Sequence, residues 1–333
     1  MTDKAADGFR SVPSRVAGEL DERRSLASRA LAYGVPFLDD ALRALLPHDL
    51  VLLGAPSGVG KTDLAISIAA GNARAGRRVH YFALEAEPRE IERRIKFARL
   101  VEAAAESVHP RTADLNFVDW MLGRCEHVVE AFNATVDQSL LEDFCKLRTF
   151  YRGAKFDQAD LRRMVLEVAT ETDLIVIDHL HYVDTDTDEN EHRALGELVK
   201  TIRDLSLRIG KPIILIAHLR KRDPRAKQLV ATLDDFHGSS NVAKIATHAI
   251  TIERAPFPPA RWYLAPTFVS IAKDRRGGAP GVVALAMFDR RFRTYAPTYT
   301  LGRLKAGGTE WEPLAMSDVP RWARQHRALE GSA

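Results

Sequence analysis

Short apolar runs alternate with helical patterns along most of the chain. The runs at 49–55, 79–84, 174–180 and 212–218 are apolar almost throughout, as expected of strands buried on both faces of a sheet. Helical patterns fill the segments between them, and the pattern at 62–75 is apolar nearly all round, which predicts a buried helix. This alternation of strands and helices predicts a mostly parallel twisted α/β sheet with helices on both faces.

The rest of the chain departs from this alternation. Residues 108–165 have mostly helical patterns, with one strand-like run at 147–153. Three strand-like runs then follow one another without a helix between them, at 247–254, 268–274 and 282–288. Their succession predicts an antiparallel C-terminal extension of the sheet. The sequence after Pro297 is polar, with a short helical pattern close to its end.

A separate helical pattern precedes the first strand. Residues 1–12 are polar and predict no ordered element, whereas residues 14–31 place an apolar stripe on one face of a helix. The stripe consists of Val16, Leu20, Ala27 and Leu31. Such a stripe needs a partner, and two stay open: the chain's own domain or a neighbouring subunit.

A glycine-rich turn lies directly between the first strand and the helix that follows. Its sequence, APSGVGKT, fits the phosphate-loop pattern, with Ala55 at the first position in place of glycine. The glycines let backbone N–H groups face phosphates, and the helix N-terminus adds partial positive charge. Lys61 would reach the terminal phosphates, and Thr62 would ligate Mg²⁺. The residues expected to bind the nucleotide are Ala55, Pro56, Ser57, Gly58, Val59, Gly60, Lys61 and Thr62.

Two acidic residues stand where apolar strands end. Asp178 ends the run LIVID, where a carboxylate can hold the hydration shell of Mg²⁺ beside Thr62, although it could instead cap a turn. Glu85 ends the run YFALE. Hydrolysis of a bound nucleotide needs a carboxylate that orients or deprotonates water, and Glu85 is a better candidate for it than Glu87. Glu87 is a weaker rival, because its place just before Pro88 suits helix capping. The plainer interpretation of Glu85 is a solvated loop carboxylate.

Composition narrows the function classes. The 333 residues are 46% hydrophobic, which suffices for one large or two small domains. A net charge of +3 and a pI near 8.8 are too mild to indicate a nucleic-acid partner on their own. Cys125 and Cys145 lack metal-ligand spacing and indicate a reducing compartment. Neither a signal peptide nor a bilayer-spanning run is present, so we expect a cytoplasmic protein with no membrane partner.

Two further motifs invite a metal-site interpretation that the sequence does not support. The run DTDTDENEH lacks the central glycine and the closing glutamate of an EF-hand loop and indicates an acidic loop. His179 and His181 have alternating strand spacing without a second ligand pair, which favours structural histidines over zinc ligands. His179 also stands directly after the strand aspartate, where many ATPases carry an acid.

The order of these motifs resembles the DnaB-like replicative helicases, which are hexameric ring motors with a RecA-type core. The resemblance covers about residues 34–296 and rests on six segments. These are APSGVGKT, FALEAEPREIERRI, LIVIDHLHYVD, PIILIAHLRKR, DDFHGSSNVAKIATHAITIER and the Lys-x-Arg-x-Gly hairpin AKDRRGGAPGVVALAMF. It implies a RecA-like P-loop ATPase domain at 34–296, an N-terminal extension with a linker helix at 1–33, and a tail at 297–333.

The resemblance also implies roles for individual residues. Lys273 and Arg275 would reach across a subunit interface to the neighbour's terminal phosphate, supplying positive charge where the transition state develops negative charge. His218 would act as a phosphate sensor, in the place where these helicases usually carry glutamine, and can still hydrogen-bond a phosphate. The residues that would serve the subunit's own ATP and Mg²⁺ are Lys61, Thr62, Asp178 and Glu85.

A basic segment follows the predicted sensor strand and leads to the sequence HGSSN. Such a loop would project toward the pore of a ring, where basic side chains neutralise phosphates without reading bases. An exposed charged loop is the plainer interpretation. His237 replaces the arginine that the family carries in this loop. The residues expected to bind DNA are Arg220, Lys221, Arg222, His237, Gly238, Ser239 and Ser240, with Arg225 and Lys227 nearby.

The sequence therefore predicts a ring-forming ATPase, a hexamer that translocates on single-stranded DNA as a helicase. Too few residues precede Ser14 for the N-terminal domain with which DnaB binds primase, so the chain looks more like single-domain helicases of plasmids and phages. Loader or replication proteins are the other expected partners. The alternative is a KaiC- or RadA-like ATPase for recombination, repair or regulation that separates no strands. A slow, nucleotide-gated scaffold is a third class.

Overall fold

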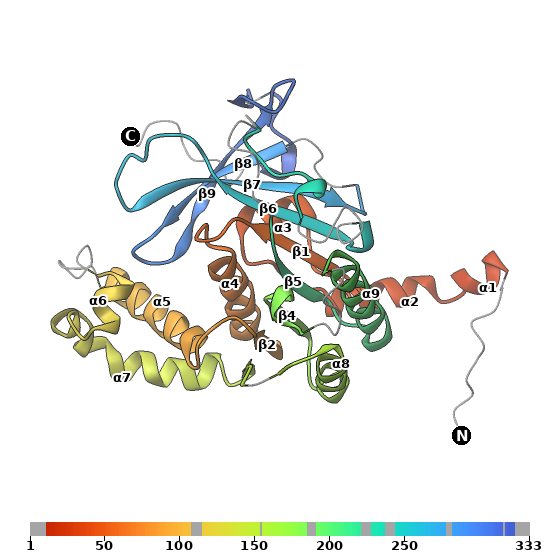
Figure 1. The fold of residues 1–333 in the computed structure, drawn as a ribbon, viewed down its shortest axis with the longest axis horizontal. Coiled ribbons are helices and arrows are strands. Elements are labelled where there is room, and N and C mark those ends of the chain that lie inside the picture. The colour runs from red at the N-terminus through yellow and green to blue at the C-terminus, as the bar shows by residue number, and fades with distance from the viewer. Residues whose placement is uncertain are drawn as a thin grey trace.

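The computed structural model describes residues 11–107, 115–153, 155–184, 191–220, 228–236, 244–277, 282–315 and 317–323. Figure 1 shows the order of its elements along the chain. The strands are β1 (Leu50–Ala55), β2 (Val79–Ala83), β3 (Leu147–Tyr151), β4 (Leu174–Asp178), β5 (Ile213–His218), β6 (His248–Arg254), β7 (Leu264–Asp274), β8 (Val282–Asp289), β9 (Thr294–Leu304) and β10 (Trp311–Pro313). The α-helices are α1 (Val12–Val16), α2 (Glu19–Arg29), α3 (Pro36–Leu42), α4 (Lys61–Arg74), α5 (Glu90–Glu106), α6 (Phe117–Met121), α7 (Glu126–Asp143), α8 (Gln158–Glu167) and α9 (Glu191–Ile209). Single 3₁₀ turns are η2 (Leu180–Tyr182), η3 (Leu233–Asp235) and η4 (Arg321–Ala323).

All ten strands form one sheet in the order β10-β9-β8-β7-β6-β1-β5-β4-β2-β3. The six strands from β6 to β3 in this order are parallel, and β7 to β10 continue the sheet in antiparallel fashion. The predicted parallel sheet with an antiparallel C-terminal extension is confirmed, although the first of the three late runs, β6, pairs parallel to β1 and the extension begins at β7. The parallel part has two edges, and each carries a distinct set of side chains. The carboxyl edge lies where β1, β2, β4 and β5 end, and the amino edge lies where they begin.

Alternate residues of the parallel strands enter two different cores. In β1, Val51 and Leu53 pack with α3, α4 and part of α5, whereas Leu50 and Leu52 pack with α8 and α9. Helices therefore cover both faces, which explains why the sequences of these strands are continuous apolar runs. A third cluster joins α5 to α6 and α7, which lie together at one side of the molecule in Figure 1.

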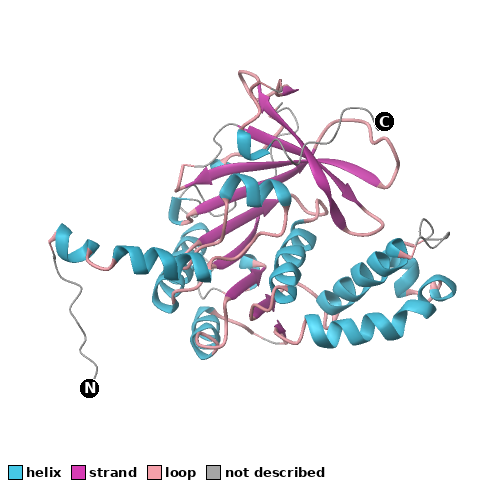
Figure 2. Cartoon of the chain, turned by 180° about the vertical axis from the view of Figure 1, so that it is seen from behind, coloured by secondary structure: helices cyan, strands magenta, loops and turns pink. Residues whose placement is uncertain are grey.

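The N-terminal helices stand away from the sheet. In Figure 1 and Figure 2, α1 and α2 project beyond the rest of the molecule. The predicted single helix is broken at Gly18, whose φ of +85° favours glycine, and no residue of α2 is buried. Val16 and Leu20 are 54% and 50% exposed, and only Leu31, beyond the end of α2, enters the core. The stripe therefore has little contact with its own domain.

The chain beyond residue 296 continues the sheet. β9 runs across Pro297, and β10 pairs with it in antiparallel fashion. Leu314, Val319 and Ala323 are buried in the main core, although they belong to the predicted tail. Of the short helix expected near the end, one 3₁₀ turn (η4) is described, and 324–333 lie outside the described residues. The domain limits themselves stay a prediction. Among the described helices, none combines the length and apolar character needed to cross a bilayer.

Candidate active site

The glycine-rich turn connects β1 directly to α4, as the sequence predicts. Gly58 and Gly60 have φ angles of +76° and +107°, a region that strains residues with a side chain. A Cβ on Gly60 would lie 3.2 Å from atoms of Phe288 and Tyr295, so the turn is also tightly packed. The first backbone N–H groups of α4 have no partner within the helix, which leaves them available to an anion.

Lys61 and Asp178 meet at the carboxyl edge, where both are almost fully buried. The Lys61 side chain opens α4, and Asp178 is the last residue of β4. The hydroxyl of Tyr81 donates a hydrogen bond of 2.8 Å to Oδ2 of Asp178. Burial raises the pKa of Asp178 to about 6, as does the nearby charge of Glu85, while the Tyr81 hydrogen bond, Lys61 and Thr62 lower it.

The second carboxylate oxygen of Asp178 indicates that this residue could bind a metal ion. Oδ1 of Asp178 is buried and has no hydrogen-bond partner among the described atoms. A buried carboxylate oxygen normally has a partner, so one supplied from outside the chain is expected here. Thr62 interacts with the same carboxyl group. The pair therefore fits Mg²⁺ with its water shell, which prefers oxygen ligands.

Glu85 lies beside Asp178 although the two residues are far apart in the sequence. β2 and β4 are neighbouring parallel strands with Ala83 opposite Asp178, so both carboxylates follow strands that end together. The backbone N–H of Glu85 donates to the carbonyl of Asp178 at 3.4 Å. Glu85 is exposed, as a group that meets substrate or water must be. Its rival Glu87 is also exposed, and its carbonyl accepts the N–H of Glu90 in the turn that opens α5.

His218 ends β5 directly beside the glycine-rich turn. Its register partner on β1 is Ala55, the first residue of that turn. Its ring centroid lies 3.9 Å from that of His179 and 5.4 Å from that of His181. Three histidines thus gather at the carboxyl edge, where the sequence suggested one sensor and two structural residues. Sequence reasoning missed this cluster because β5 and β4 are neighbours only in the folded sheet.

Lys273 and Arg275 lie at the opposite, amino edge. They flank Asp274, which ends β7 beside His248 at the start of β6. The amino edge is separated from the start of the phosphate turn by the six residues of β1, which span about 20 Å as an extended strand. Both cations are therefore too far away to reach the phosphate turn of their own chain.

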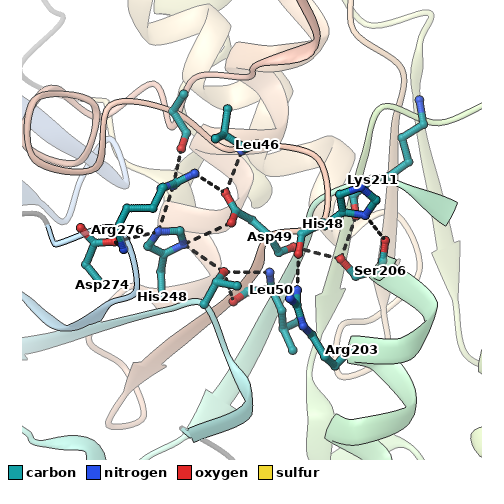
Figure 3. Close-up of polar contacts among 12 residues, drawn as sticks. Leu46, His48, Asp49, Leu50, Arg203, Ser206, Lys211, His248, Asp274 and Arg276 are labelled. Atoms are coloured by element: carbon teal, nitrogen blue, oxygen red, sulfur yellow. Dashed lines mark hydrogen bonds and ion pairs between the residues drawn. The ribbon is translucent and has the colours of Figure 1, made fainter. Parts of the chain in front are cut away.

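A polar network fixes the hairpin turn that carries these two cations (Figure 3). His248 is fully buried and lies 3.1 Å from Oδ1 of Asp274 through Nε2. Arg276 donates to Oδ2 of Asp49, just before β1, at 3.0 Å and to the carbonyl of Ala44 at 2.9 Å. The Arg275 side chain is exposed, and its backbone N–H donates to Thr247. The hairpin is thus anchored to the core while Arg275 points outward.

A third cation, Arg203 on α9, joins this group and was missed by sequence reasoning. Its guanidinium donates to the carbonyl of His48 (Figure 3). Burial lowers the pKa of Arg203, and the charge of Arg275 lowers it further. The pKa of Lys273 is likewise lowered by burial, by Arg275 and by Arg203. Together the three cations give this part of the surface a positive potential, which attracts anions.

Most of the predicted DNA-binding residues lie outside the described residues. Arg220 is exposed just after β5, and its backbone N–H donates to the carbonyl of Asp235 at 2.7 Å. The DNA-binding assignment stays a prediction. Of the acidic run at 184–192, residues 185–190 lie outside the described residues, where the loop interpretation stays a prediction, whereas Glu191 begins α9. The remaining undescribed members are Lys221, Arg222, Arg225, Lys227, His237, Gly238, Ser239 and Ser240.

Comparison with known proteins identifies relatives for this arrangement. The family model described as the DnaB-like helicase C-terminal domain matches residues 30–296. A "Probable plasmid replicative DNA helicase" from Chlamydia trachomatis is 28% identical over 227 residues, covering 68% of this chain and 47% of that protein. The chain therefore spans about half the length of this curated relative.

Two solved structures show the same fold. One is described as "The Structure Of A DnaB-Like Replicative Helicase And Its Interactions With Primase"; its TM-score is 0.69 at 14% identity, over 86% of this chain and 68% of that one. The other is a KaiC-like protein from Pyrococcus horikoshii, with a TM-score of 0.52 at 15% identity, over 79% of this chain and 96% of that one. At these identities the likeness establishes the RecA-like fold and nothing finer.

Proposed function

This chain belongs to the DnaB-like helicase C-terminal domain family, and we propose that it is an ATP-dependent DNA helicase that works as a ring in the cytoplasm. The observation that carries the proposal is the division of polar residues between the two edges of the sheet. The carboxyl edge holds a phosphate turn, a buried aspartate and an exposed glutamate. The amino edge presents cations that their own phosphate turn cannot use.

ATP hydrolysis would take place at the carboxyl edge. Lys61 and the N–H groups at the start of α4 would bind the phosphates, and the histidine ring of His218 would hydrogen-bond the terminal one. Glu85 would orient a water molecule and accept its proton as the water attacks. Thr62 and Asp178 would hold Mg²⁺, which supplies charge neutralisation on the phosphates when bound. Oδ1 of Asp178, which has no hydrogen-bond partner within the described part of the chain, supports this assignment.

The second half of the catalytic site would come from a neighbouring subunit. Arg275 and Lys273 would contact the terminal phosphate bound by the next chain, and Arg203 adds charge beside them. A contact between the amino edge of one chain and the carboxyl edge of the next is heterologous, and repeating such a contact forms a ring when the rotation between subunits closes. We expect six subunits, as the resemblance implies. The exposed stripe of α1 and α2 supports docking on a neighbour over packing within the chain.

The track would be single-stranded DNA bound in the pore. Arg220 follows the sensor strand directly, so a change at the phosphate would be transmitted through β5 to the segment that contains the DNA-binding residues. Backbone phosphates would supply the affinity, without base-specific contacts. Loader or other replication proteins would place the ring on DNA.

Unwinding of a forked DNA duplex with ATP and Mg²⁺ tests this function. We expect strand separation that requires hydrolysable ATP and is absent in the Lys61→Ala variant. ATP hydrolysis without unwinding on any fork polarity would instead support the KaiC- or RadA-like alternative, whose fold this chain also shares.

A further inference from the structure

The carboxyl edge holds a second group of metal-ligand atoms, separate from the oxygen pair of Thr62 and Asp178. Glu85, His179 and His218 each offer one ligand atom, and these atoms all lie within 4.8 Å of one another. They come from the ends of three strands, β2, β4 and β5. Two imidazoles and one carboxylate form a set that zinc and its neighbours among the divalent transition metals accept, whereas Mg²⁺ prefers oxygen alone.

The surroundings of His179 favour a role as a metal ligand. It is fully buried, and its Nε2 has no hydrogen-bond partner among the described atoms. Its Nδ1 lies 3.2 Å from Nδ1 of His181, and when Nδ1 of His179 donates the proton in this contact, Nε2 of His179 has a free lone pair. At metal sites, a hydrogen bond from the other ring nitrogen commonly fixes the tautomer of a ligating histidine. Burial also lowers the pKa of His179 to about 2, which keeps the ring neutral.

We propose that Glu85, His179 and His218 bind a divalent transition metal such as Zn²⁺, and that this metal inhibits the enzyme. Three protein ligands leave one position of a tetrahedral ion for water. The charge of Lys61 reaches His179 and opposes a cation, so the site binds more weakly than a structural zinc site. The ligand set is open and reversible, since Glu85 is exposed and His218 is half-buried.

Inhibition follows from the identity of the ligands, and this part rests on the proposed function. A carboxylate of Glu85 that ligates a metal cannot accept a proton from the attacking water. An imidazole of His218 that ligates the same metal cannot hydrogen-bond the terminal phosphate. Metal binding therefore removes two groups from hydrolysis, while the phosphate turn and its Lys61 remain able to bind nucleotide.

Cobalt absorption tests the binding part without any need for ATP hydrolysis. Co²⁺ is added to the nucleotide-free full chain, in which Cys145→Ser removes the exposed thiol in every protein compared. We expect a saturable visible band with one Co²⁺ per chain, which added Zn²⁺ bleaches because zinc binds such sites more tightly. His218→Gln and Glu85→Gln are each expected to weaken the affinity for Co²⁺ by about 100-fold.

The matched control is His127→Ala, which removes an exposed histidine from α7 and should leave both the band and the affinity unchanged. Absence of a saturable band, or unchanged affinity in both ligand variants, would overturn the proposal. An equal loss in His127→Ala would also overturn it, because it would indicate adventitious surface binding.

ATP hydrolysis at fixed Mg·ATP with added Zn²⁺ tests the inhibitory part. The unaltered chain should lose hydrolysis as Zn²⁺ rises, and the residual activity of His218→Gln should resist the same concentrations. Equal inhibition of both would contradict a role for this site. If the chain shows no ATP hydrolysis at all, the proposed function is refuted. The cobalt measurement would then still test the metal site by itself.

Discussion

The two edges of the parallel sheet differ in whether their charged side chains are buried or exposed. At the carboxyl edge, Lys61, Asp178 and His179 are buried, and the charge of Lys61 acts on the other two. At the amino edge, Arg275 is exposed on a hairpin that a buried network holds in place. One edge is shaped to receive a ligand, and the other is shaped to present charge to something outside the chain. In the proposed function, neither edge is a complete catalytic site alone.

The largest effects are expected at the carboxyl edge. Lys61→Ala should abolish ATP hydrolysis, because the main side-chain charge on the terminal phosphates is removed. Glu85→Gln should retain ATP binding and lose turnover, since only water activation is removed. Nucleotide binding and steady-state hydrolysis measure both. Glu87→Gln is the matched control, and wild-type turnover by Glu85→Gln would show that Glu85 is not the catalytic carboxylate.

Arg275→Ala at the amino edge should leave nucleotide affinity nearly intact and reduce hydrolysis by about 10³-fold or more, as removal of an arginine in trans does elsewhere. Its own phosphate turn does not meet this side chain, so affinity and turnover should separate. Isothermal calorimetry and hydrolysis rates measure the two. Arg148→Ala removes an exposed arginine from β3 as a control. A large decrease of nucleotide affinity in Arg275→Ala would contradict the division between the edges.

Arg276→Ala should act through the position of the hairpin. Removing its bonds to Asp49 and Ala44 should lower the free energy of unfolding by about 1–3 kcal/mol. Misplacing Arg275 should also lower kcat by about 10- to 100-fold with little change in KM for ATP. Denaturant unfolding and steady-state kinetics test these effects separately. If Arg276→Ala is destabilised but keeps the wild-type kcat, Arg276 has only a structural role.

Replacing Arg220, Lys221 and Arg222 together with alanine should weaken DNA binding while leaving the proposed nucleotide-binding and catalytic residues unchanged. Basal hydrolysis should survive and DNA stimulation should disappear. The salt dependence of affinity should flatten by about one unit for each DNA phosphate that the protein no longer neutralises. Titration of single-stranded DNA at several salt concentrations measures the slope. If the triple variant keeps the wild-type slope and full stimulation, the track lies elsewhere.

The smallest effect is expected from Asp173, a structural group at the amino edge. Arg78 holds the pKa of Asp173 well below its usual range through hydrogen bonds of 2.9 and 3.1 Å. A depressed pKa stabilises the fold above the unfolded pKa, so this contribution is lost as pH falls. Asp173→Asn should lower the free energy of unfolding by about 1–2 kcal/mol at neutral pH, and the difference should shrink below about pH 4. If the difference in the free energy of unfolding stays constant down to low pH, the ion pair between Arg78 and Asp173 does not contribute as described. A change in ATP hydrolysis would contradict a purely structural role for Asp173.

The sequence predicts the parallel sheet and the turn at Gly58 and Gly60 because both depend on local patterns. It also identifies Asp178 and Glu85, since polar residues at strand ends stand out after apolar runs. The pairing of β2 with β4 then brings them together. The role of each remains a prediction until it is measured.

The features that sequence reasoning missed depend on strand order and on contacts between distant elements. The histidine cluster forms because β4 and β5 are neighbours, an order that no local pattern encodes. In the sequence, Arg203 resembles any other charge on a solvated helix face, and only the fold brings it to Lys273. β9 was missed beyond Pro297 because exposed, half-buried and buried residues are mixed along it without a regular alternation or an apolar run.

Co-assembly of two inactive variants tests most directly whether the two edges of different chains form one catalytic site. Lys61→Ala and Arg275→Ala proteins are mixed in equal amounts, and mixed assemblies are verified by distinct tags before hydrolysis is measured. About a quarter of the interfaces in a random mixture would join an intact phosphate turn to an intact Arg275. We therefore predict hydrolysis well above that of either variant alone. No gain in verified mixtures would contradict catalysis across the subunit interface.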